Sequence, residues 1–234
     1  MTYREEVDVY HGIPVQYEVT PFRLNQYEID VILNKEFFHP VGNDLTKTSF
    51  LLNDSRLHRV KNFLDERMKN YIENVVEIEN EFVMTQSWST ITKKGENHHS
   101  HSHHNSIFSL VFYVSSEGEK SGNLVFDFGH SRLMEKMNFT YDVKNYNGFN
   151  AGEWDYVVNA GDIVLFPSWV RHRTRENTSD KDRIIIGANY FINGIVGTTK
   201  GVNKIGIELG NLEDSDDAIP HSKVGIELGD LKDD

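Results

Sequence analysis

From residue 81 to residue 192, the chain is a succession of short segments rich in β-branched and aromatic residues, separated by Gly, Asn and Ser. This pattern is typical of strands joined by turns, and many short strands favour an antiparallel sandwich or jelly roll. The expected strands are Phe82–Ile91, Ile107–Ser115, Asn123–Phe128, Phe139–Val143, Trp154–Val158, Asp162–Phe166 and Arg183–Ile192. We therefore expect a mainly β fold with flanking α-helix.

A supporting helix is predicted before these strands. Apolar residues recur there with helical spacing, and charged residues lie between them. They are Leu57, Val60, Phe63, Leu64, Met68, Tyr71, Ile72 and Val75. Asp54 and Ser55 are candidate N-caps. A strand pair around residues 11–14 and a brief helix near Leu24–Leu33 are expected upstream.

The chain divides into three regions on these patterns. Residues 1–80 form a support region, residues 81–195 a β core, and residues 196–234 an acidic extension. The extension contains a repeat, in which Lys204–Leu212 recurs as Lys223–Leu231. Two copies are too few for a solenoid. Within the core, residues 129–153 have the least regular pattern and are expected to be an insert or lid with Gly148 and Gly152 as hinges.

Charge and composition exclude several classes of protein. The formal net charge is −12, which argues against a nucleic-acid-binding protein because phosphate binding depends on Lys and Arg. The N-terminus lacks the apolar segment of a secretory signal, and no apolar run approaches the ~20 residues of a membrane helix. We expect a cytoplasmic protein, in the host cytoplasm if the chain is phage-encoded, with no membrane partner.

A histidine cluster is the strongest functional signal. Five histidines fall within seven residues, at positions 98, 99, 101, 103 and 104, and His172 follows the segment Gly161–Pro167. Alternate residues of a strand share a face, so His101 and His103 can point the same way and His172 can reach them from a second strand. His99 shares this alternation, whereas His98 and His104 would face the other way. The chain has no cysteine, so a metal must be held by nitrogen and oxygen.

At this point the chain resembles a known family. The resemblance rests on Trp88, on His101-Ser-His103-His-Asn105, on Gly122-Asn-Leu-Val-Phe126, on Gly161-Asp-Ile-Val-Leu-Phe-Pro-Ser-Trp169-Val-Arg-His172 and on Asp182-Arg183 with Asn189. These residues look like those of the 2-oxoglutarate/Fe(II) oxygenases, and most like an uncharacterised subgroup common in marine phages and bacteria. The resemblance covers about residues 80–193.

The resemblance implies a double-stranded β-helix fold and a set of site residues. It implies His101 as first metal ligand, His103 at the position that is usually Asp or Glu, and His172 as distal ligand. It also implies that Arg183 holds the far carboxylate of 2-oxoglutarate, a pairing that suits a planar guanidinium. The implied cofactors are Fe(II), 2-oxoglutarate and dioxygen. Tyr113 and Asn189 are candidate cofactor-binding residues.

Several alternatives stay open at this stage. Asp127, on a neighbouring predicted strand, could supply the missing carboxylate ligand, and Arg183 could instead pair with Asp180 or Asp182. Trp169 could line the pocket. A cupin-type metalloprotein would need no Arg183. A jelly-roll binding or virion-associated module would use the histidines without catalysis.

The favoured hypothesis is an Fe(II)- and 2-oxoglutarate-dependent dioxygenase that hydroxylates a small-molecule or peptide substrate. Such an enzyme couples oxidative decarboxylation of 2-oxoglutarate, which yields succinate and carbon dioxide, to oxidation of the substrate. The sequence does not name that substrate. A homo-oligomer is compatible with these expectations.

Overall fold

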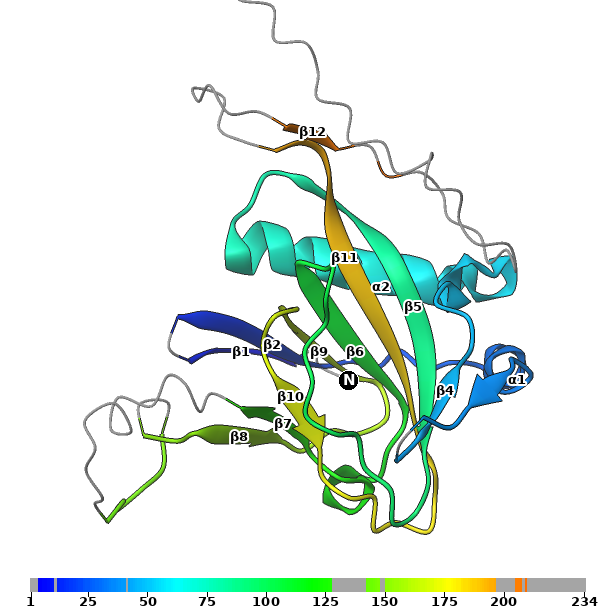
Figure 1. Ribbon diagram of the computed structural model, residues 1–234, viewed down its shortest axis with the longest axis vertical. Coiled ribbons are helices and arrows are strands. Elements are labelled where there is room, and N and C mark those ends of the chain that lie inside the picture. The colour runs from blue at the N-terminus through cyan, green and yellow to red at the C-terminus, as the bar shows by residue number, and fades with distance from the viewer. Residues whose placement is uncertain are drawn as a thin grey trace, which may run out of the picture.

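The larger of two β-sheets organises the molecule. The computed structural model describes residues 4–10, 12–40, 42–127, 142–147, 150–196, 205–207 and 209. The strands of the larger sheet are β1 (Arg4–Tyr10), β2 (Ile13–Val19), β3 (Phe37–Phe38), β4 (Asp44–Thr46), β5 (Glu81–Thr92), β6 (Phe108–Ser115), β9 (Asp162–Pro167), β11 (Arg183–Val196) and β12 (Ile205–Ile207). Their order is β1-β2-β9-β6-β11-β5-β4-β3, with β12 paired to β11 (Figure 1).

A smaller sheet covers part of one face of the larger sheet. Its strands are β7 (Leu124–Asp127), β8 (Glu153–Tyr156) and β10 (His172–Thr174), in the order β10-β7-β8. Leu124 and Phe126 of this sheet pack with Tyr113 and Phe166 of the larger one in a buried core. Side chains alternate along each strand, so the inward-facing residues of both sheets meet between them. The result is an antiparallel β-sandwich.

Two helices accompany the sheets. Helix α1 spans Gln26–Leu33 and begins at a capping box, in which Asn25 and Glu28 each accept a hydrogen bond from the other's backbone N–H. Helix α2 spans His58–Tyr71 and continues as a π-helical turn, Ile72–Val76. Short 3₁₀ turns lie at Leu51–Asn53, Ser55–Leu57 and Gly118–Ser121.

Helix α2 lies along the outer face of the larger sheet (Figure 1). The buried side chains of α2 that face the sheet include Leu64 and Met68, and they share one core with Phe112, Ile186 and Ala188 of the central strands. Strands β6 and β11 are therefore covered on both faces, which explains their nearly continuous apolar sequence. Within the described part of the chain, no helix has the length and apolar character needed to cross a bilayer.

The structure confirms both predicted helices, the strand pair around residues 11–14 and six of the seven strands predicted in the core, each within a few residues. Leu57 and Tyr71 are fully buried on the predicted apolar face, and Asp54 caps the 3₁₀ turn that precedes α2 by accepting from the backbone of Arg56. Strands β3, β4 and β10 were not predicted. Strands β2 to β4 belong to the same sheet as the core strands, although they lie in the region expected to be a support.

Three sequence predictions fall largely outside the described residues. The predicted strand Phe139–Val143 is described only at residues 142 and 143, which are not in a strand. The expected insert at 129–153 is described only at residues 142–147 and 150–153. Of the repeat in the extension, residues 205–207 form β12, and the second copy lies outside the described residues.

Candidate metal centre

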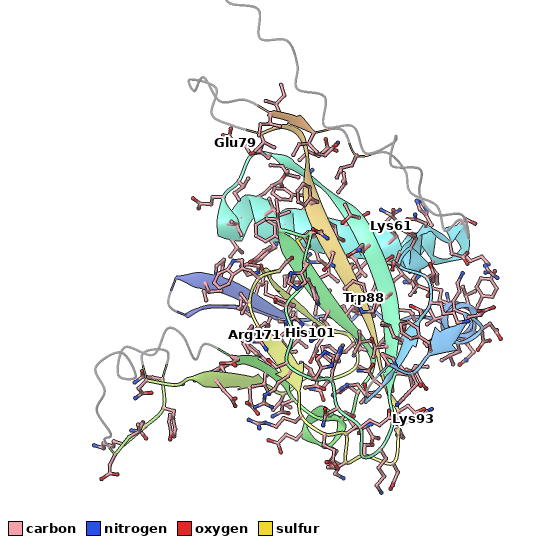
Figure 2. The ribbon with its side chains drawn as sticks, viewed as in Figure 1. Lys61, Glu79, Trp88, Lys93, His101 and Arg171 are labelled. Atoms are coloured by element: carbon pink, nitrogen blue, oxygen red, sulfur yellow. The ribbon has the colours of Figure 1, made fainter. Side chains whose placement is uncertain are left out.

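Three histidines converge between the two sheets, at the sites predicted from the sequence. His101 and His172 form an antiparallel bridge, and the ring centroids of this pair are 4.3 Å apart. His103 lies two residues after His101, with its ring centroid 5.3 Å from that of His101 and 4.9 Å from that of His172. One ligand atom from each of the three rings lies within 4.8 Å of the others. Figure 2 shows His101 in this region, near Trp88 of β5.

The outer nitrogen of two rings is fixed by a backbone carbonyl. Nδ1 of His101 lies 2.9 Å from the carbonyl of His99, and Nδ1 of His172 lies 3.0 Å from the carbonyl of Val170. A carbonyl can only accept, so Nδ1 must carry the proton in both rings. In a neutral ring, Nε2 then carries no proton, and its lone pair is available to bind a metal. Histidine ligands of metals are held in this way, with the second nitrogen donating to a carbonyl or carboxylate.

The third ring is fixed by a side-chain relay instead. Nδ1 of His103 lies 2.7 Å from Oγ of Ser109. Ser109 donates its single proton to Oδ1 of Asn189 at 2.7 Å, and Nδ2 of Asn189 donates to Gln86 at 2.8 Å. Because its proton is used, Ser109 accepts from His103. Nε2 of His103 is therefore also free to bind a metal.

Burial keeps these rings neutral. Burial lowers the pKa of His103 to about 4, lowers the pKa of His101, and lowers that of His172 well below its usual value. Charging more than one of the rings would also place positive charges side by side. Neutral imidazole is the form that binds a metal. The three rings therefore form a nitrogen donor set that is ready for metal at neutral pH.

Trp88 lies behind His103. The two rings meet edge to face, with centroids 5.3 Å apart. The indole lies against Gly187 of the neighbouring strand β11, where an added Cβ would be 2.5 Å from Cε2 and Cζ2. Glycine at position 187 thus leaves the space that the indole fills.

A buried guanidinium lies in the same pocket. Arg183, the first residue of β11, is only 2% exposed. It donates to the carbonyls of Ser121 and Gly122 at 2.7 and 3.0 Å, and to the hydroxyls of Thr92 and Thr174 at 3.0 and 2.8 Å. Within the described part of the chain, no carboxylate pairs with it, since Asp180 binds Lys94. An unpaired buried charge is costly, so this arginine is suited to an anionic ligand.

Among the described residues, none that lines the narrow pocket between the histidines and Arg183 is acidic. Its lining residues are Trp88, Thr90, Thr92, His98, His101, His103, Val111, Tyr113, Leu124, His172, Arg173, Thr174, Arg183 and Ile185. Tyr113 is buried, and its hydroxyl has no hydrogen-bond partner among the described residues. Burial raises the pKa of Tyr113, so this hydroxyl remains a proton donor. Such a lining favours a polar, negatively charged ligand.

Other predicted site residues lie elsewhere. Asn189 lies behind His103, in the hydrogen-bond relay, and does not line the pocket. Trp169 is 63% exposed and is also absent from the lining. Asp127 alternates along β7 with Phe126, whose ring faces His172. Its carboxylate is accordingly not part of the histidine group.

Some residues of the site, in the pocket lining or in the hydrogen-bond relay behind it, were missed from the sequence although a signal was present. Thr90 and Thr92 follow Trp88 at alternate positions of β5, and Ser109 precedes Tyr113 at alternate positions of β6. The alternation of side chains along a strand, which placed His101 and His103 on one face, would also have placed these residues at the site. His98 was expected to face away, yet it lines the pocket.

A family model described as "Putative 2OG-Fe(II) oxygenase" matches residues 86–189. These residues contain Arg183 and all three histidines. This region is therefore similar to the 2OG-Fe(II) oxygenase family. Fe(II) and 2-oxoglutarate, the predicted cofactors, are those that the family is named for.

Solved structures agree with the oxygenase fold. The chain is similar to the non-heme alpha-ketoglutarate-dependent epimerase SnoN from nogalamycin biosynthesis, with a TM-score of 0.53 and 12% identity over 80% of this chain and 82% of that one. HygX from Streptomyces hygroscopicus, solved with nickel and 2-oxoglutarate, has a TM-score of 0.51 and 13% identity, over 74% of this chain and 82% of that one. The carbocyclase SnoK from nogalamycin biosynthesis has a TM-score of 0.51 and 13% identity, over 76% of this chain and 80% of that one. No curated protein matches the chain.

These similarities confirm the predicted fold class. The antiparallel sheets form a double-stranded β-helix, or jelly roll, with α2 as its supporting helix. At such identities the similarity concerns the fold alone. Function must be argued from the site.

Proposed function

We propose that this chain is an Fe(II)- and 2-oxoglutarate-dependent dioxygenase that hydroxylates a small-molecule or peptide substrate. One observation carries the proposal. Three histidines with free Nε2 atoms share a pocket with a buried guanidinium that has no carboxylate partner in the described structure. A metal-binding group and an anion-binding group in one pocket are what a chelating dicarboxylate requires.

His101, His103 and His172 would hold the metal. Imidazole suits iron among the divalent metals, and three protein ligands leave coordination positions open for other ligands. When bound, Fe(II) with 2-oxoglutarate and dioxygen supplies an oxidant able to attack an unactivated C–H bond. The chain itself supplies neutral donors, a fixed ring orientation and a pocket walled by Val111, Leu124 and other buried residues.

Arg183 would bind the distal carboxylate of 2-oxoglutarate. Its guanidinium can form a charge-assisted pair with that group. Thr92 and Thr174 hold the guanidinium by accepting hydrogen bonds, so their own O–H groups remain available to a ligand oxygen. The hydroxyl of Tyr113 is a further donor. A cationic pocket in a chain of net charge −12 would draw in a dianion selectively.

His103 gives the centre a distinctive charge. A neutral imidazole replaces the usual carboxylate, so the loaded site carries one more positive charge. The buried relay through Ser109 and Asn189 contains no ionised group, and it therefore stabilises His103 without restoring the lost negative charge. This charge would strengthen the retention of anionic 2-oxoglutarate.

The reaction class rests on the chemistry of the site more than on similar structures, since those include an epimerase and a carbocyclase. Hydroxylation is the simplest use of such an oxidant. The acidic chain favours neither nucleic acid nor a membrane as a partner.

Turnover of 2-oxoglutarate tests this function. Purified protein loaded with Fe(II) in air should convert 2-oxoglutarate to succinate, slowly without substrate and faster when a substrate is supplied from a metabolite or peptide library. The accelerating compound should gain one oxygen atom by mass spectrometry. His172→Ala should abolish both signals. Iron binding without succinate formation by the wild-type protein would contradict the proposal and favour a cupin-type metalloprotein.

A further inference from the structure

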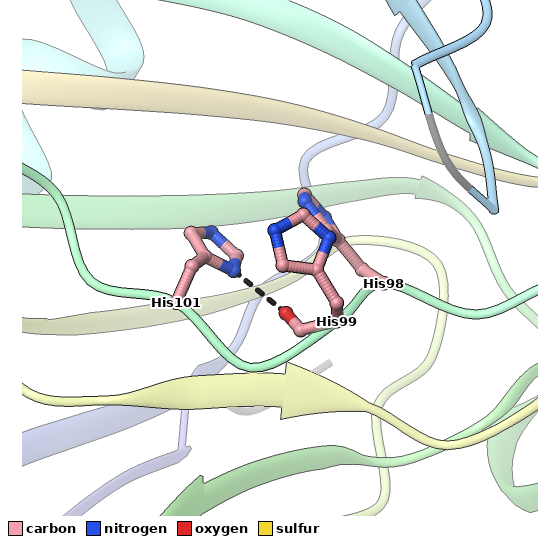
Figure 3. A group of neighbouring side chains, drawn as sticks. All are labelled: His98, His99 and His101. Atoms are coloured by element: carbon pink, nitrogen blue, oxygen red, sulfur yellow. Dashed lines mark hydrogen bonds between the residues drawn. The ribbon is translucent and has the colours of Figure 1, made fainter.

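A second histidine group lies beside the metal centre. It consists of His98, His99 and His101, and one ligand atom from each lies within 4.8 Å of the others (Figure 3). The ring centroid of His98 is 4.3 Å from that of His101 and 5.2 Å from that of His99, and the His99 and His101 centroids are 5.5 Å apart. We call this the outer group, and His101, His103 and His172 the inner group.

The backbone explains why two neighbouring residues face the same ring. Residues 96–100 are not in a strand, so the alternation of side chains that holds in a strand does not apply to them. The segment is nevertheless held against β10. The N–H of His98 donates to Oγ1 of Thr174 at 2.8 Å, and the N–H of Thr174 donates to the carbonyl of His98 at 3.0 Å. The outer group is therefore built on a fixed segment.

The two groups share His101 and differ in burial. His99 is exposed, His98 and His101 are partly buried, and His172 is 4% exposed. The Nδ1 atom of His101 is engaged by the carbonyl of His99, so a single nitrogen of this ring is free. That nitrogen can serve one ion at a time. The two groups are thus alternative binding sites for the same ion. The outer group faces solvent, and the inner group is buried.

The donor distances fit an ion after small movements. Nitrogen ligands at about 2.1 Å from a metal are about 3 Å apart when they occupy one face of it. The donor atoms of the outer group already lie within 4.8 Å of one another, so rotation of the rings would bring them towards this separation. The ring of His99 is exposed to solvent.

We infer that the outer group captures a divalent transition-metal ion and passes it to the inner group by ligand exchange around His101. The bonds to His98 and His99 break while those to His103 and His172 form. Only metal–nitrogen bonds change, so no electron is transferred. The inference rests on the proposed function for the role of the inner group.

Co²⁺ binding to the metal-free full-length protein tests the inference, because the visible absorption of Co²⁺ reports its ligands. In stopped-flow experiments, His99→Ala should slow the association of Co²⁺ several-fold and leave the equilibrium Kd nearly unchanged. His104→Ala is the matched control, since His104 is an exposed histidine a few residues further along the chain and belongs to neither group. Equal association rates in the wild type and His99→Ala would overturn the inference.

A second arm separates this inference from the proposed function. His103→Ala should retain one weaker Co²⁺ site in the outer group, and His99→Ala/His103→Ala should lose it. Loss of all binding in His103→Ala alone would overturn the outer group and leave the proposed function intact. Tight binding that survives both His103→Ala and His172→Ala would instead overturn the inner group as the metal centre, and with it the proposed function.

Discussion

His101 and His172 lie directly opposite each other and exchange both of their backbone hydrogen bonds, at 2.9 and 2.8 Å. Such a pair fixes the two Cα atoms about 5.5 Å apart, independently of the side chains. Two of the three inner histidines are therefore positioned by strand pairing. Substituting one of these side chains should remove a ligand without moving the other.

The hydrogen bond from His103 to Ser109 predicts an effect on metal affinity. Ser109→Ala would leave Nδ1 of His103 without its 2.7 Å partner. We expect the Kd for Fe(II) or Co²⁺ to rise about 10- to 100-fold, the usual cost of losing an outer partner of a ligand. Competition with a chelator measures it. Ser106→Ala is the control, because Ser106 reaches this network only through Ser168. An equal loss in both variants would refute a specific role for Ser109.

A substitution of Arg183 should weaken the binding of 2-oxoglutarate without weakening the binding of the metal. Arg183→Lys keeps the charge and loses the planar two-pronged geometry. We expect the Kd for 2-oxoglutarate to rise about 10- to 150-fold, because a hydrogen bond to a charged group contributes about 1.5–3 kcal/mol, while the Kd for metal stays unchanged. Calorimetry with the metal-loaded protein measures both. Arg175→Lys, at an exposed arginine that pairs with Asp155, should change neither. Unaltered 2-oxoglutarate affinity in Arg183→Lys would exclude the assigned role.

Gly187 predicts a packing effect at the site. A Cβ at this position would be 2.5 Å from the indole of Trp88, which packs against His103. Gly187→Ala should lower the free energy of unfolding by about 1–3 kcal/mol, as overpacking does, and should also weaken metal binding. Denaturant unfolding and metal titration measure the two effects. Gly206→Ala has nothing within 4 Å of its added Cβ and should be nearly neutral. Normal stability of Gly187→Ala would show that the indole can move freely.

Glu28 predicts part of the response to acid. It accepts two hydrogen bonds from Arg59, which lower the pKa of this buried carboxyl below its usual value. The folded state thus favours the ionised form, and its stabilising effect is present above about pH 4.5 and is lost as the pH falls through the lowered pKa. Glu28→Gln should cost about 1–3 kcal/mol at pH 7, and progressively less below pH 4.5.

Unfolding by denaturant at several pH values checks the Glu28 prediction. Glu36→Gln is the matched control, because Glu36 and its partner Lys47 are 79% and 59% exposed at the side chain and such pairs contribute little. A pH-independent difference between the wild type and Glu28→Gln would show that the ionisation of Glu28 is not what stabilises the contact.

Periodicity made much of this structure predictable. Helical spacing located α2 because one face of that helix is buried along its whole length, and runs of β-branched and aromatic residues located the central strands. Strand β10 was not predicted because three residues are too few for a periodic signal. Strands β3 and β4 have only two and three residues, and β4 pairs with the distant strand β5.

The histidines illustrate the same limit at the site. Alternation correctly places His101 and His103 on one side, and the structure brings His172 to them. It fails for His98, because the segment before His101 bends outside any strand. The place of Asn189 behind His103 depends on the register between β5, β11 and β6, which no local pattern contains.

The most direct test of the proposed centre is an anaerobic titration of metal-free protein with Fe(II) and then 2-oxoglutarate, followed by visible absorption. Chelation of iron by 2-oxoglutarate should produce a charge-transfer band with one equivalent of each. The band should be lost in His172→Ala, and in Arg183→Lys it should require more 2-oxoglutarate. Iron binding by the wild-type protein without a band would contradict the assignment of this pocket to Fe(II) and 2-oxoglutarate. A band that neither substitution changes would contradict it as well.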